Sequence, residues 1–359
     1  MLKYAFGALR TLLFRTPLNV RLWVTMRCNY RCQTCGIPEV KPIPEMGLDE
    51  FDQVAANLSR LGVSQVVLTG GEAFLRSDIV EIIRLFADRH FIVRIQTNGG
   101  AHVTEDLLRR SYKAGLQDIG ISLDTLDEEA YDKFCGTKDA VKNALRVLRL
   151  CLSKYPSRGV ISANVVISKK NFYDLPAMMD FVQDLGACFV PCIMTGKFSE
   201  LGKSEPDYFQ SFGLPDLYQA DPSRAEQIFA EIDTRVQKGY RILTTSRIWD
   251  DLRRYMRTGD CRWRCLAGEI SFDITPDGAI APCSDTLQAA YEQPVLNAKS
   301  SDFIERFKGS GYREKCRSYQ NECQGCLYGC YRDPFYLVTD LRIPFEVFLK
   351  SIRFKKFLH

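Results

Sequence analysis

The chain has 359 residues, enough for one large α/β domain with a smaller appendage or for two domains. Its hydrophobic fraction of 46% and charged fraction of 26% are ordinary for a globular protein, and a net charge of +4 is too small to indicate binding to nucleic acid. There is no apolar run of about eighteen residues and no secretory signal over residues 1–20, so we expect a cytoplasmic protein without a transmembrane span.

The middle of the chain alternates short β-rich runs with amphipathic stretches. Strands are predicted at 20–25, 65–68, 91–96, 118–122, 160–167 and 188–194. Helices are predicted at 49–61, 77–88, 104–115, 127–155, with a break at Gly136, and 173–185. These repeats predict an open barrel or a doubly wound sheet, and in both folds the functional site lies at the carboxyl ends of the strands.

The composition changes after Thr195. Residues 196–221 are rich in Gly, Pro, Ser and aromatic residues and read as a long connection, and a helix is expected at 223–238. The runs 270–274 and 279–282 flank Thr-Pro-Asp-Gly, which predicts a hairpin. We therefore expect five parts, an N-terminal amphipathic helix, a core, a connection with a helix, a cysteine-rich domain and a basic amphipathic tail, at 1–17, 18–195, 196–255, 256–335 and 336–359.

The chain contains fourteen cysteines but only three histidines. Disulfides are rare in the cytosol, where thiols stay reduced. Clustered thiols in such a protein indicate a metal site, and soft thiolates favour zinc or iron–sulfur.

The first cluster, Cys28, Cys32 and Cys35, has the spacing CxxxCxxC directly after the first strand. Three thiolates on one loop can hold three irons of a 4Fe–4S cluster and leave the fourth iron open for a ligand. Tetrahedral zinc needs a fourth ligand, and the next Cys or His residues are far along the chain. Polar residues between the cysteines argue against three buried free thiols.

Polar motifs follow the next strands: Leu68-Thr-Gly-Gly-Glu72, Gln96-Thr-Asn-Gly99 and Ser122-Leu-Asp124. Alone, each polar residue is more commonly a turn or cap residue. In this order, together with the cysteine motif, residues 18–195 resemble the radical SAM superfamily, which binds S-adenosylmethionine (SAM). The resemblance implies a partial (β/α)6 barrel of TIM type, with Gly70, Gly71 and Glu72 at the amino group of SAM, Thr97, Asn98, Ser122 and Asp124 near its ribose and carboxylate, and Asn164 as a further ribose contact.

The resemblance also implies an activity. SAM would bind the open iron and be cleaved reductively to methionine and a 5′-deoxyadenosyl radical, which abstracts hydrogen from a substrate. The reaction requires an external one-electron donor such as a flavodoxin or ferredoxin. Asp285, beside Cys283, is a weak candidate for a catalytic residue, because a lone loop aspartate is more often a cap.

Cys265-x12-Gly278-x4-Cys283 resembles the opening of a SPASM or twitch domain, an extension that carries auxiliary iron–sulfur clusters. One auxiliary 4Fe–4S cluster could be closed by four thiolates, those of Cys265, Cys283, Cys323 and Cys326. A second would draw on Cys261, Cys316 and Cys330 and be one thiolate short. A structural zinc knuckle is the alternative. Small buried apolar side chains are expected at Cys135, Cys151, Cys188 and Cys192.

Both ends of the chain are basic and apolar. Residues 1–21 and residues 341–359 each carry a net charge of +4. Basic amphipathic helices of this type bind anionic membrane interfaces, but they also cover the floor of a barrel. Peripheral contact of both termini with the cytoplasmic membrane face is therefore a hypothesis, and it suggests a lipid-like substrate.

Three functions remain open at this point. The first is a radical SAM enzyme that acts on a small molecule or lipid-like substrate. The second is a peptide-modifying SPASM maturase, which is less favoured because only about twenty residues precede the first strand, too few for a leader-binding domain. The third is a non-enzymatic metal-binding module.

Overall fold

The structure is a computed structural model that describes residues 2–33, 35–37, 43–155, 159–193 and 213–355. Eight strands form one sheet in the order β6-β5-β4-β3-β2-β1-β7-β8. All neighbouring strands are parallel except β7 and β8. The strands are β1 Asn19–Thr25, β2 Gln65–Gly70, β3 Ile92–Thr97, β4 Asp118–Ser122, β5 Ile161–Ile167, β6 Cys188–Ile193, β7 Ser271–Ile274 and β8 Ile280–Ala281.

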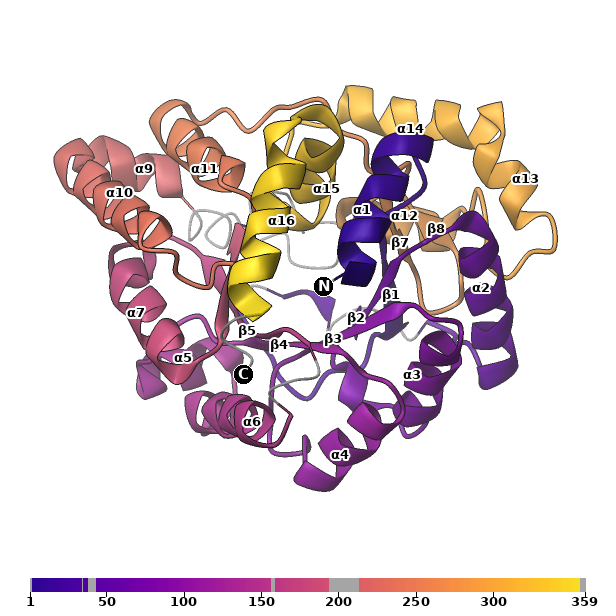
Figure 1. The fold of residues 1–359 in the computed structure, drawn as a ribbon, viewed down its shortest axis with the longest axis horizontal. Coiled ribbons are helices and arrows are strands. Elements are labelled where there is room, and N and C mark those ends of the chain that lie inside the picture. Colours follow the sequence, from indigo (N-terminus) through magenta and orange to yellow (C-terminus); the bar gives the residue numbers. More distant parts are fainter. Residues whose placement is uncertain (1, 34, 38–42, 156–158, 194–212, 356–359) are drawn as a thin grey trace.

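The first six strands follow one another in space as they do in sequence. A doubly wound sheet would reverse direction at a switch point, so this order excludes that alternative and confirms the partial barrel. Figure 1 shows the intervening helices in an arc around the strands. The helix predicted at 127–155 is broken where Gly136 adopts the left-handed region, with φ of 62°.

The helices of the barrel and its N-terminal cover are α1 Leu2–Phe14, α2 Leu48–Leu61, α3 Ile79–Asp88, α4 Glu105–Lys113, α5 Glu128–Cys135, α6 Ala140–Lys154 and α7 Leu175–Leu185. Those that follow are α9 Leu214–Ala220, α10 Pro222–Gln237, α11 Arg247–Thr258, α12 Leu287–Glu292, α13 Phe303–Lys308, α14 Ser310–Glu322, α15 Gly329–Thr339 and α16 Arg342–Lys355. Most of the connection predicted at 196–221 lies outside the described residues. Within the described residues, no helix combines the length and hydrophobicity needed to cross a bilayer.

The inside of the barrel is polar. Successive strand residues point to opposite faces, and the apolar set, such as Val20 and Leu22, lies in the main core. The other set makes polar contacts between strands that are not neighbours. Gln65 of β2 reaches Asp118 of β4 at 3.4 Å, and Arg94 of β3 donates to the Ser162 hydroxyl of β5 at 2.6 Å. Such contacts cross the interior, where a bound ligand would meet polar groups.

The cysteine-rich C-terminal part joins the same sheet. Strand β7 pairs in parallel with β1, and α15 contacts both β6 and β7, so it lies across the open side of the barrel. The predicted hairpin between β7 and β8 is confirmed, since Gly278 has φ of 92° and its N–H donates to the Thr275 carbonyl at 2.9 Å. The five-part division remains a prediction, and its last boundary falls inside α15.

Candidate functional site

The three cysteines of the first cluster lie on one loop at the carboxyl end of β1. Main-chain hydrogen bonds tether this loop to the end of α5: the Arg31 N–H donates to the Cys135 carbonyl at 2.9 Å, and the Gln33 N–H to the Phe134 carbonyl at 2.8 Å. The three cysteines are each partly exposed. Three accessible thiols on one tethered loop are a donor set that fits three irons of a 4Fe–4S cluster.

The thiol of Cys32 is directed at a fourth cysteine. Its hydrogen bond with the thiol of Cys135 is the main cause that raises the pKa of Cys32, and burial adds to it. Burial also raises the pKa of Cys28. Among the described side chains, no three Cys, His, Asp or Glu residues are close enough together to hold a metal ion. Metal binding by Cys32 would replace its contact with Cys135 and displace the thiol proton.

Gly70, the last residue of β2, and Gly71, which follows it, allow the end of β2 to approach the backbone at the end of β1 closely. A Cβ atom on Gly70 would lie 2.1 Å from the Thr25 carbonyl oxygen, and one on Gly71 would lie 2.2 Å from that of Arg27. The Gly71 N–H donates to Thr25 at 2.9 Å, and the Glu72 N–H donates to Arg27 at 2.8 Å. The glycines therefore fix the start of the cysteine loop against the end of β2. Their predicted approach to SAM remains a prediction.

Glu72 is fully buried and joins two strand ends. Its carboxylate accepts hydrogen bonds from the Thr97 hydroxyl at 2.9 Å, the Asn98 N–H at 2.7 Å and the Phe74 N–H at 3.0 Å. These donors already occupy the carboxylate, so in this structure Glu72 positions the segment after β3. Its predicted contact with the amino group of SAM remains a prediction.

A chain of side chains that the sequence did not reveal continues from Glu72 to the cysteine loop. His102 Nε2 lies 3.6 Å from the Glu72 carboxylate, and His102 Nδ1 lies 3.3 Å from the Asn29 amide nitrogen. The Asn98 amide donates to Asn29 at 2.9 Å and lies 4.0 Å from the Cys28 sulfur. Asn29 lies within the cysteine motif and could have been suspected there, but nothing in the sequence linked His102 to it.

The predicted residues on β4 and β5 also come together. Ser122 and Asn164 are paired across the two strands. The side-chain oxygen of Asn164 accepts from the Ser162 hydroxyl at 3.0 Å, and that of Asp124 accepts from the Val166 N–H at 2.7 Å. Burial raises the pKa of Asp124 to about 7, so its carboxyl group titrates near neutral pH. The polar residues predicted to contact SAM thus lie at the ends of β2, β3 and β4 and, in the case of Asn164, in the middle of β5.

In the C-terminal extension, Cys265 and Cys283 pack against the buried Cys326, and Cys323, three residues before Cys326, is exposed. Burial is the main cause of the raised pKa of each of Cys265, Cys283 and Cys326. The pKa of Cys265 is raised to about 11. A smaller increase in each pKa comes from a neighbouring thiol: Cys323 acts on Cys265, Cys265 on Cys326, and Cys326 on Cys283. Four thiolates are the number that one auxiliary cluster or one zinc ion requires, but in this structure no three of these four side chains are close enough together to hold a single ion.

The remaining cysteines of the extension have separate partners. The Cys316 thiol is fully buried against Tyr312 and occupies the space beside Gly268. The Cys261 thiol lies 3.7 Å from the Gln324 carbonyl oxygen. Cys330 accepts a hydrogen bond from Arg21. Of the four cysteines expected to be buried, Cys135, Cys151 and Cys188 are buried, and Cys192 is partly exposed.

Asp285 is held by a hydrogen bond of 3.0 Å from the Tyr328 hydroxyl. Its charge contributes to the raised pKa of Cys283 and Cys326, after burial as the main cause. Asp285 therefore belongs to the surroundings of the auxiliary cysteines. Its catalytic role remains a prediction.

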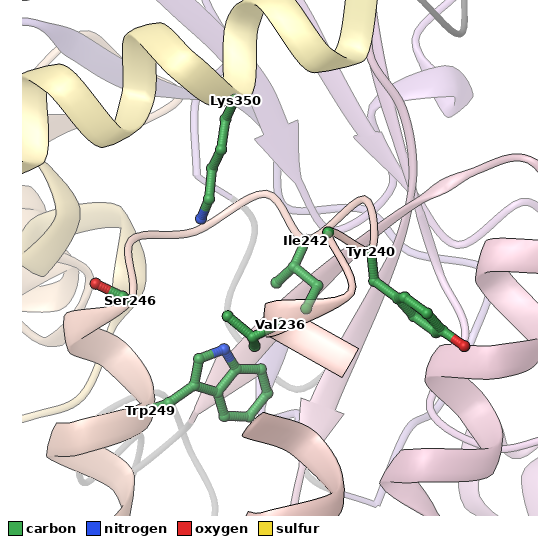
Figure 2. Close-up of a pocket in the computed structure, with 7 residues that line it drawn as sticks. Val236, Tyr240, Ile242, Ser246, Trp249 and Lys350 are labelled. Atoms are coloured by element: carbon green, nitrogen blue, oxygen red, sulfur yellow. The ribbon is translucent and has the colours of Figure 1, made fainter. Parts of the chain in front are cut away.

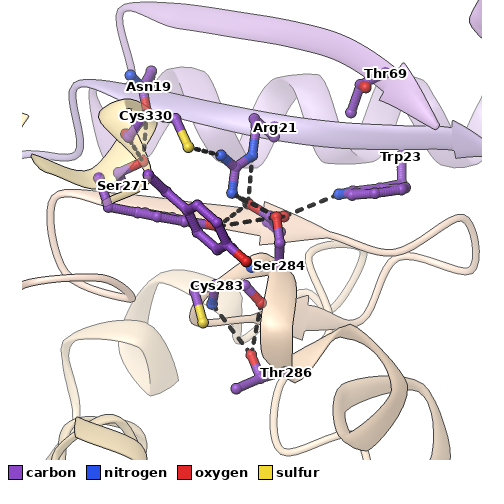
Figure 3. A network of polar contacts seen from close by, with 12 residues as sticks. Asn19, Arg21, Trp23, Thr69, Ser271, Cys283, Ser284, Thr286 and Cys330 are labelled. Atoms are coloured by element: carbon purple, nitrogen blue, oxygen red, sulfur yellow. Dashed lines mark hydrogen bonds and ion pairs between the residues drawn. The ribbon is translucent and has the colours of Figure 1, made fainter. Parts of the chain in front are cut away.

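A buried ion pair connects the barrel to the extension (Figure 3). The Arg21 guanidinium of β1 contacts the Asp273 carboxylate of β7 at 2.6 Å. Asp273 also accepts from Trp23 at 2.9 Å and from Tyr331 at 3.0 Å. Counting Arg21 with the basic N-terminal end was therefore wrong, because its charge lies inside the sheet.

Arg332 of α15 is a second buried cation, and no sequence signal identified it. Its side chain is 0% exposed and contacts the Asp251 carboxylate at 2.5 Å. It also donates to the carbonyl oxygens of Cys326 and Cys261, each at 2.8 Å. Arg332 thus holds two cysteine-bearing segments together.

A comparison with known protein families identifies the same part of the chain as this candidate site. Residues 24–182 match the profile of the radical SAM superfamily, a segment that begins in β1 and ends in α7. It includes the first cysteine cluster and the strand ends described above. Residues 24–182 therefore form a radical SAM domain.

The similarity continues into the C-terminal extension. The chain is 24% identical to the antilisterial bacteriocin subtilosin biosynthesis protein AlbA of Bacillus subtilis, over 87% of this chain and 68% of AlbA. It is 29% identical to the PqqA peptide cyclase of Bradyrhizobium diazoefficiens, over 85% of this chain and 79% of the cyclase. Alignments of this length include most of the cysteine-rich part, as expected for a SPASM/twitch-like extension.

A solved structure shows the same fold. Streptococcus suis SuiB bound to precursor peptide SuiA superposes with a TM-score of 0.65 at 16% identity, and the match covers 91% of this chain and 74% of SuiB. The fold of the partial barrel with its C-terminal extension is therefore found in a solved structure.

Proposed function

We propose that the chain binds a 4Fe–4S cluster through Cys28, Cys32 and Cys35 and cleaves SAM reductively beside it. The observation that carries the proposal is the chain of contacts from Glu72 through His102, Asn29 and Asn98 to Cys28, because it ties the cysteine loop to the strand ends expected to contact SAM. When bound, the cluster supplies the electron that splits SAM into methionine and a 5′-deoxyadenosyl radical, which takes a hydrogen atom from the substrate.

The residues of this chain hold SAM in place. Gly70 and Gly71 keep the end of β2 against the cysteine loop, and Glu72 keeps Asn98 beside Cys28. Asp124, just after β4, and Asn164, in the middle of β5, supply polar groups for the ribose and carboxylate. The barrel enclosing them keeps bulk water from a reactive radical.

A test of this proposal compares SAM cleavage by cysteine variants. After anaerobic reconstitution with iron and sulfide, reduction with dithionite and addition of SAM, the wild type should form 5′-deoxyadenosine. Cys28→Ala, Cys32→Ala and Cys35→Ala should each abolish it. Cys151→Ala, which removes a buried thiol from α6, should retain activity. Formation of 5′-deoxyadenosine by Cys32→Ala at the wild-type rate would overturn the proposal.

The substrate class we favour is a peptide. The relatives whose alignments cover most of this chain include a PqqA peptide cyclase and a bacteriocin biosynthesis protein. Because these two alignments cover 87% and 85% of this chain, we favour a peptide substrate over a small-molecule or lipid-like substrate. The non-enzymatic module is less favoured, because residues 24–182 match the profile of the radical SAM superfamily.

Fractionated cell extract separates these substrate classes. Substrate should increase 5′-deoxyadenosine formation above the rate without substrate. If the substrate is a peptide, the stimulating fraction should lose its effect after proteinase K treatment and removal of the protease. A stimulating fraction that survives this treatment would contradict a peptide substrate and favour a small molecule.

We further propose one auxiliary 4Fe–4S cluster on Cys265, Cys283, Cys323 and Cys326, and an external one-electron donor such as a flavodoxin or ferredoxin. Support for the cluster comes from the packing of Cys265 and Cys283 against Cys326 in one cluster of side chains, with Cys323 three residues before Cys326. Iron content should be about eight per chain in the wild type and about four in Cys283→Ala. Zinc in place of the second set of irons would favour the structural zinc site.

A further inference from the structure

The two ends of the chain form one surface at the floor of the barrel. Helices α1 and α16 contact each other, and both contact α15 (Figure 1). Leu18, directly before β1, forms an apolar cluster with Leu337 of α15 and Ile343 of α16. Gly7 of α1 packs against Ser64, which directly precedes β2. This surface therefore lies at the amino ends of the strands, opposite the cysteine loop.

Exposed apolar side chains are concentrated on this surface. The described part of the chain has nine large hydrophobic side chains that are strongly exposed, and two of them, Leu48 and Leu126, lie elsewhere. The other seven lie on α1, on α16 or directly before α16, and they include Leu13 at 62%, Phe14 at 70%, Leu341 at 82% and Phe345 at 64%. Single exposed apolar residues are ordinary, but a group on adjoining helices indicates an interaction surface.

The inner side of α16 carries charged groups that are already used within the protein. Lys350 donates to the Thr244 carbonyl at 2.5 Å, and Glu346 accepts from the Ser246 hydroxyl at 2.8 Å. Figure 2 shows Lys350 of α16 directed toward the segment that contains Ser246. With these polar groups turned inward, Phe345 and Leu349 lie on exposed positions of the same helix. A helix that only covered the barrel would turn its apolar side chains inward and its charged side chains toward solvent.

The charge of these segments has one sign. Residues 1–18 contain Lys3, Arg10 and Arg15 and no acidic residue, which gives +3. Residues 341–359 carry +4, whereas the whole chain carries only +4, so residues 19–340 are net negative. An apolar surface within positively charged segments is complementary to anionic lipid, in which apolar side chains enter the interface and cations meet the headgroups.

We propose that the α1/α16 surface docks on an anionic lipid bilayer. Docking in this way directs the carboxyl ends of the strands, with Cys28, Cys32 and Cys35, away from the membrane. The surface therefore holds the enzyme at the membrane and does not deliver a lipid to the site. A docking surface on the floor of the barrel gives no support to the lipid-like substrate suggested by the sequence.

Flotation with vesicles tests this proposal on the metal-free full chain, so the result does not depend on SAM cleavage. The protein should float with vesicles that contain phosphatidylglycerol, and the bound fraction should fall about tenfold with pure phosphatidylcholine. It should also fall as salt is added, because salt screens the attraction. Absence of flotation with the anionic vesicles at low salt would overturn the proposal.

A variant with Leu13→Glu and Phe345→Glu should lose flotation, whereas Leu48→Glu, the same change at an exposed leucine on α2, should retain it. Far-ultraviolet circular dichroism of each variant checks that the fold is intact. Equal flotation of the double variant and wild type would contradict the proposal. So would a wild-type dimer in solution that becomes monomeric in the double variant, since a second copy of the chain would then occupy the surface.

Discussion

The carboxylate of Glu72, directly after β2, accepts a hydrogen bond of 2.9 Å from the hydroxyl of Thr97 at the end of β3. The same carboxylate accepts from the Asn98 N–H at 2.7 Å. One buried acid therefore sets the position of a second strand end, and through Asn98 it reaches the sulfur of Cys28. The arrangement of the proposed SAM site depends on this contact.

Replacing Glu72 tests that dependence. In Glu72→Gln the carboxamide has one acceptor oxygen, so one of the buried donors loses its partner. The free energy of unfolding should fall by about 1–3 kcal/mol, and binding of SAM should weaken. Thermal denaturation and equilibrium dialysis with SAM measure the two effects. Thr97→Val, which removes one donor to Glu72 and also the acceptor of the Gly99 N–H, should lower the free energy of unfolding as well. Unchanged stability and SAM binding in Glu72→Gln would contradict the positioning role.

The close approach at Gly71 predicts a steric effect. In Gly71→Ala the new Cβ would lie 2.2 Å from the Arg27 carbonyl oxygen, so the cysteine loop must shift. We expect a loss of about 1–3 kcal/mol and reduced iron uptake at the first cluster. The control is Gly47→Ala, where the Cβ would meet no atom within 4 Å. Equal iron uptake by the two variants would show that the loop tolerates the change.

Local sequence patterns predicted the barrel well, because each strand and helix is a short run with its own periodicity. Gly136 marked the break between α5 and α6 correctly, and Gly278 marked the hairpin turn. Long-range pairing was not predictable. No local pattern indicates that Arg21 of β1 lies beside Asp273 of β7, and so the extension was expected as a separate domain, not as part of the same sheet.

Arg332 predicts a large effect from a residue outside the cysteine motifs. Its replacement by Met removes the nearer of the two cations beside the buried Asp251 carboxylate, leaving Arg254 at 3.6 Å, and removes a donor from two cysteine carbonyls. The free energy of unfolding should fall by about 3–5 kcal/mol. Arg262→Met changes an arginine that is 72% exposed and should be nearly neutral. Thermal denaturation measures the stability of both variants. Equal stability of Arg332→Met and Arg262→Met would contradict the stabilising role of Arg332.

Asp124 predicts a dependence of stability on pH. Burial raises its pKa from 3.8 to about 7, so the folded state binds this proton more tightly than the unfolded state does. The folded state is therefore destabilised as pH rises from about 4 to about 7, by at most about 4 kcal/mol. Asp124→Asn keeps the acceptor for Val166 and should remove this loss.

Thermal denaturation of metal-free protein at pH 5 and pH 8 measures the effect. Asp124→Asn should be more stable than the wild type at pH 8, and the difference in stability between them should be much smaller at pH 5. Asp302→Asn, at a side chain that is 52% exposed, should show no such difference. A constant difference between wild type and Asp124→Asn at both pH values would contradict the raised pKa.

The candidate site was predicted where its residues follow a motif. The cysteine loop, Glu72, Asn98 and Asp124 were all identified because each lies directly at the end of a strand. His102 and Arg332 were missed, since each acts through contacts with residues distant in sequence. The partner of Cys32 was also missed, because Cys135 carries no signal beyond that of a small buried residue.

The most direct test of the account is the electron paramagnetic resonance spectrum of the reduced protein with and without SAM. Cys265→Ala combined with Cys283→Ala removes ligands of the proposed auxiliary site, so the remaining signal should come from the cluster on Cys28, Cys32 and Cys35. We predict that SAM shifts the g values of this signal, because it binds the open iron. A reduced cluster whose spectrum is unchanged by saturating SAM would contradict the account.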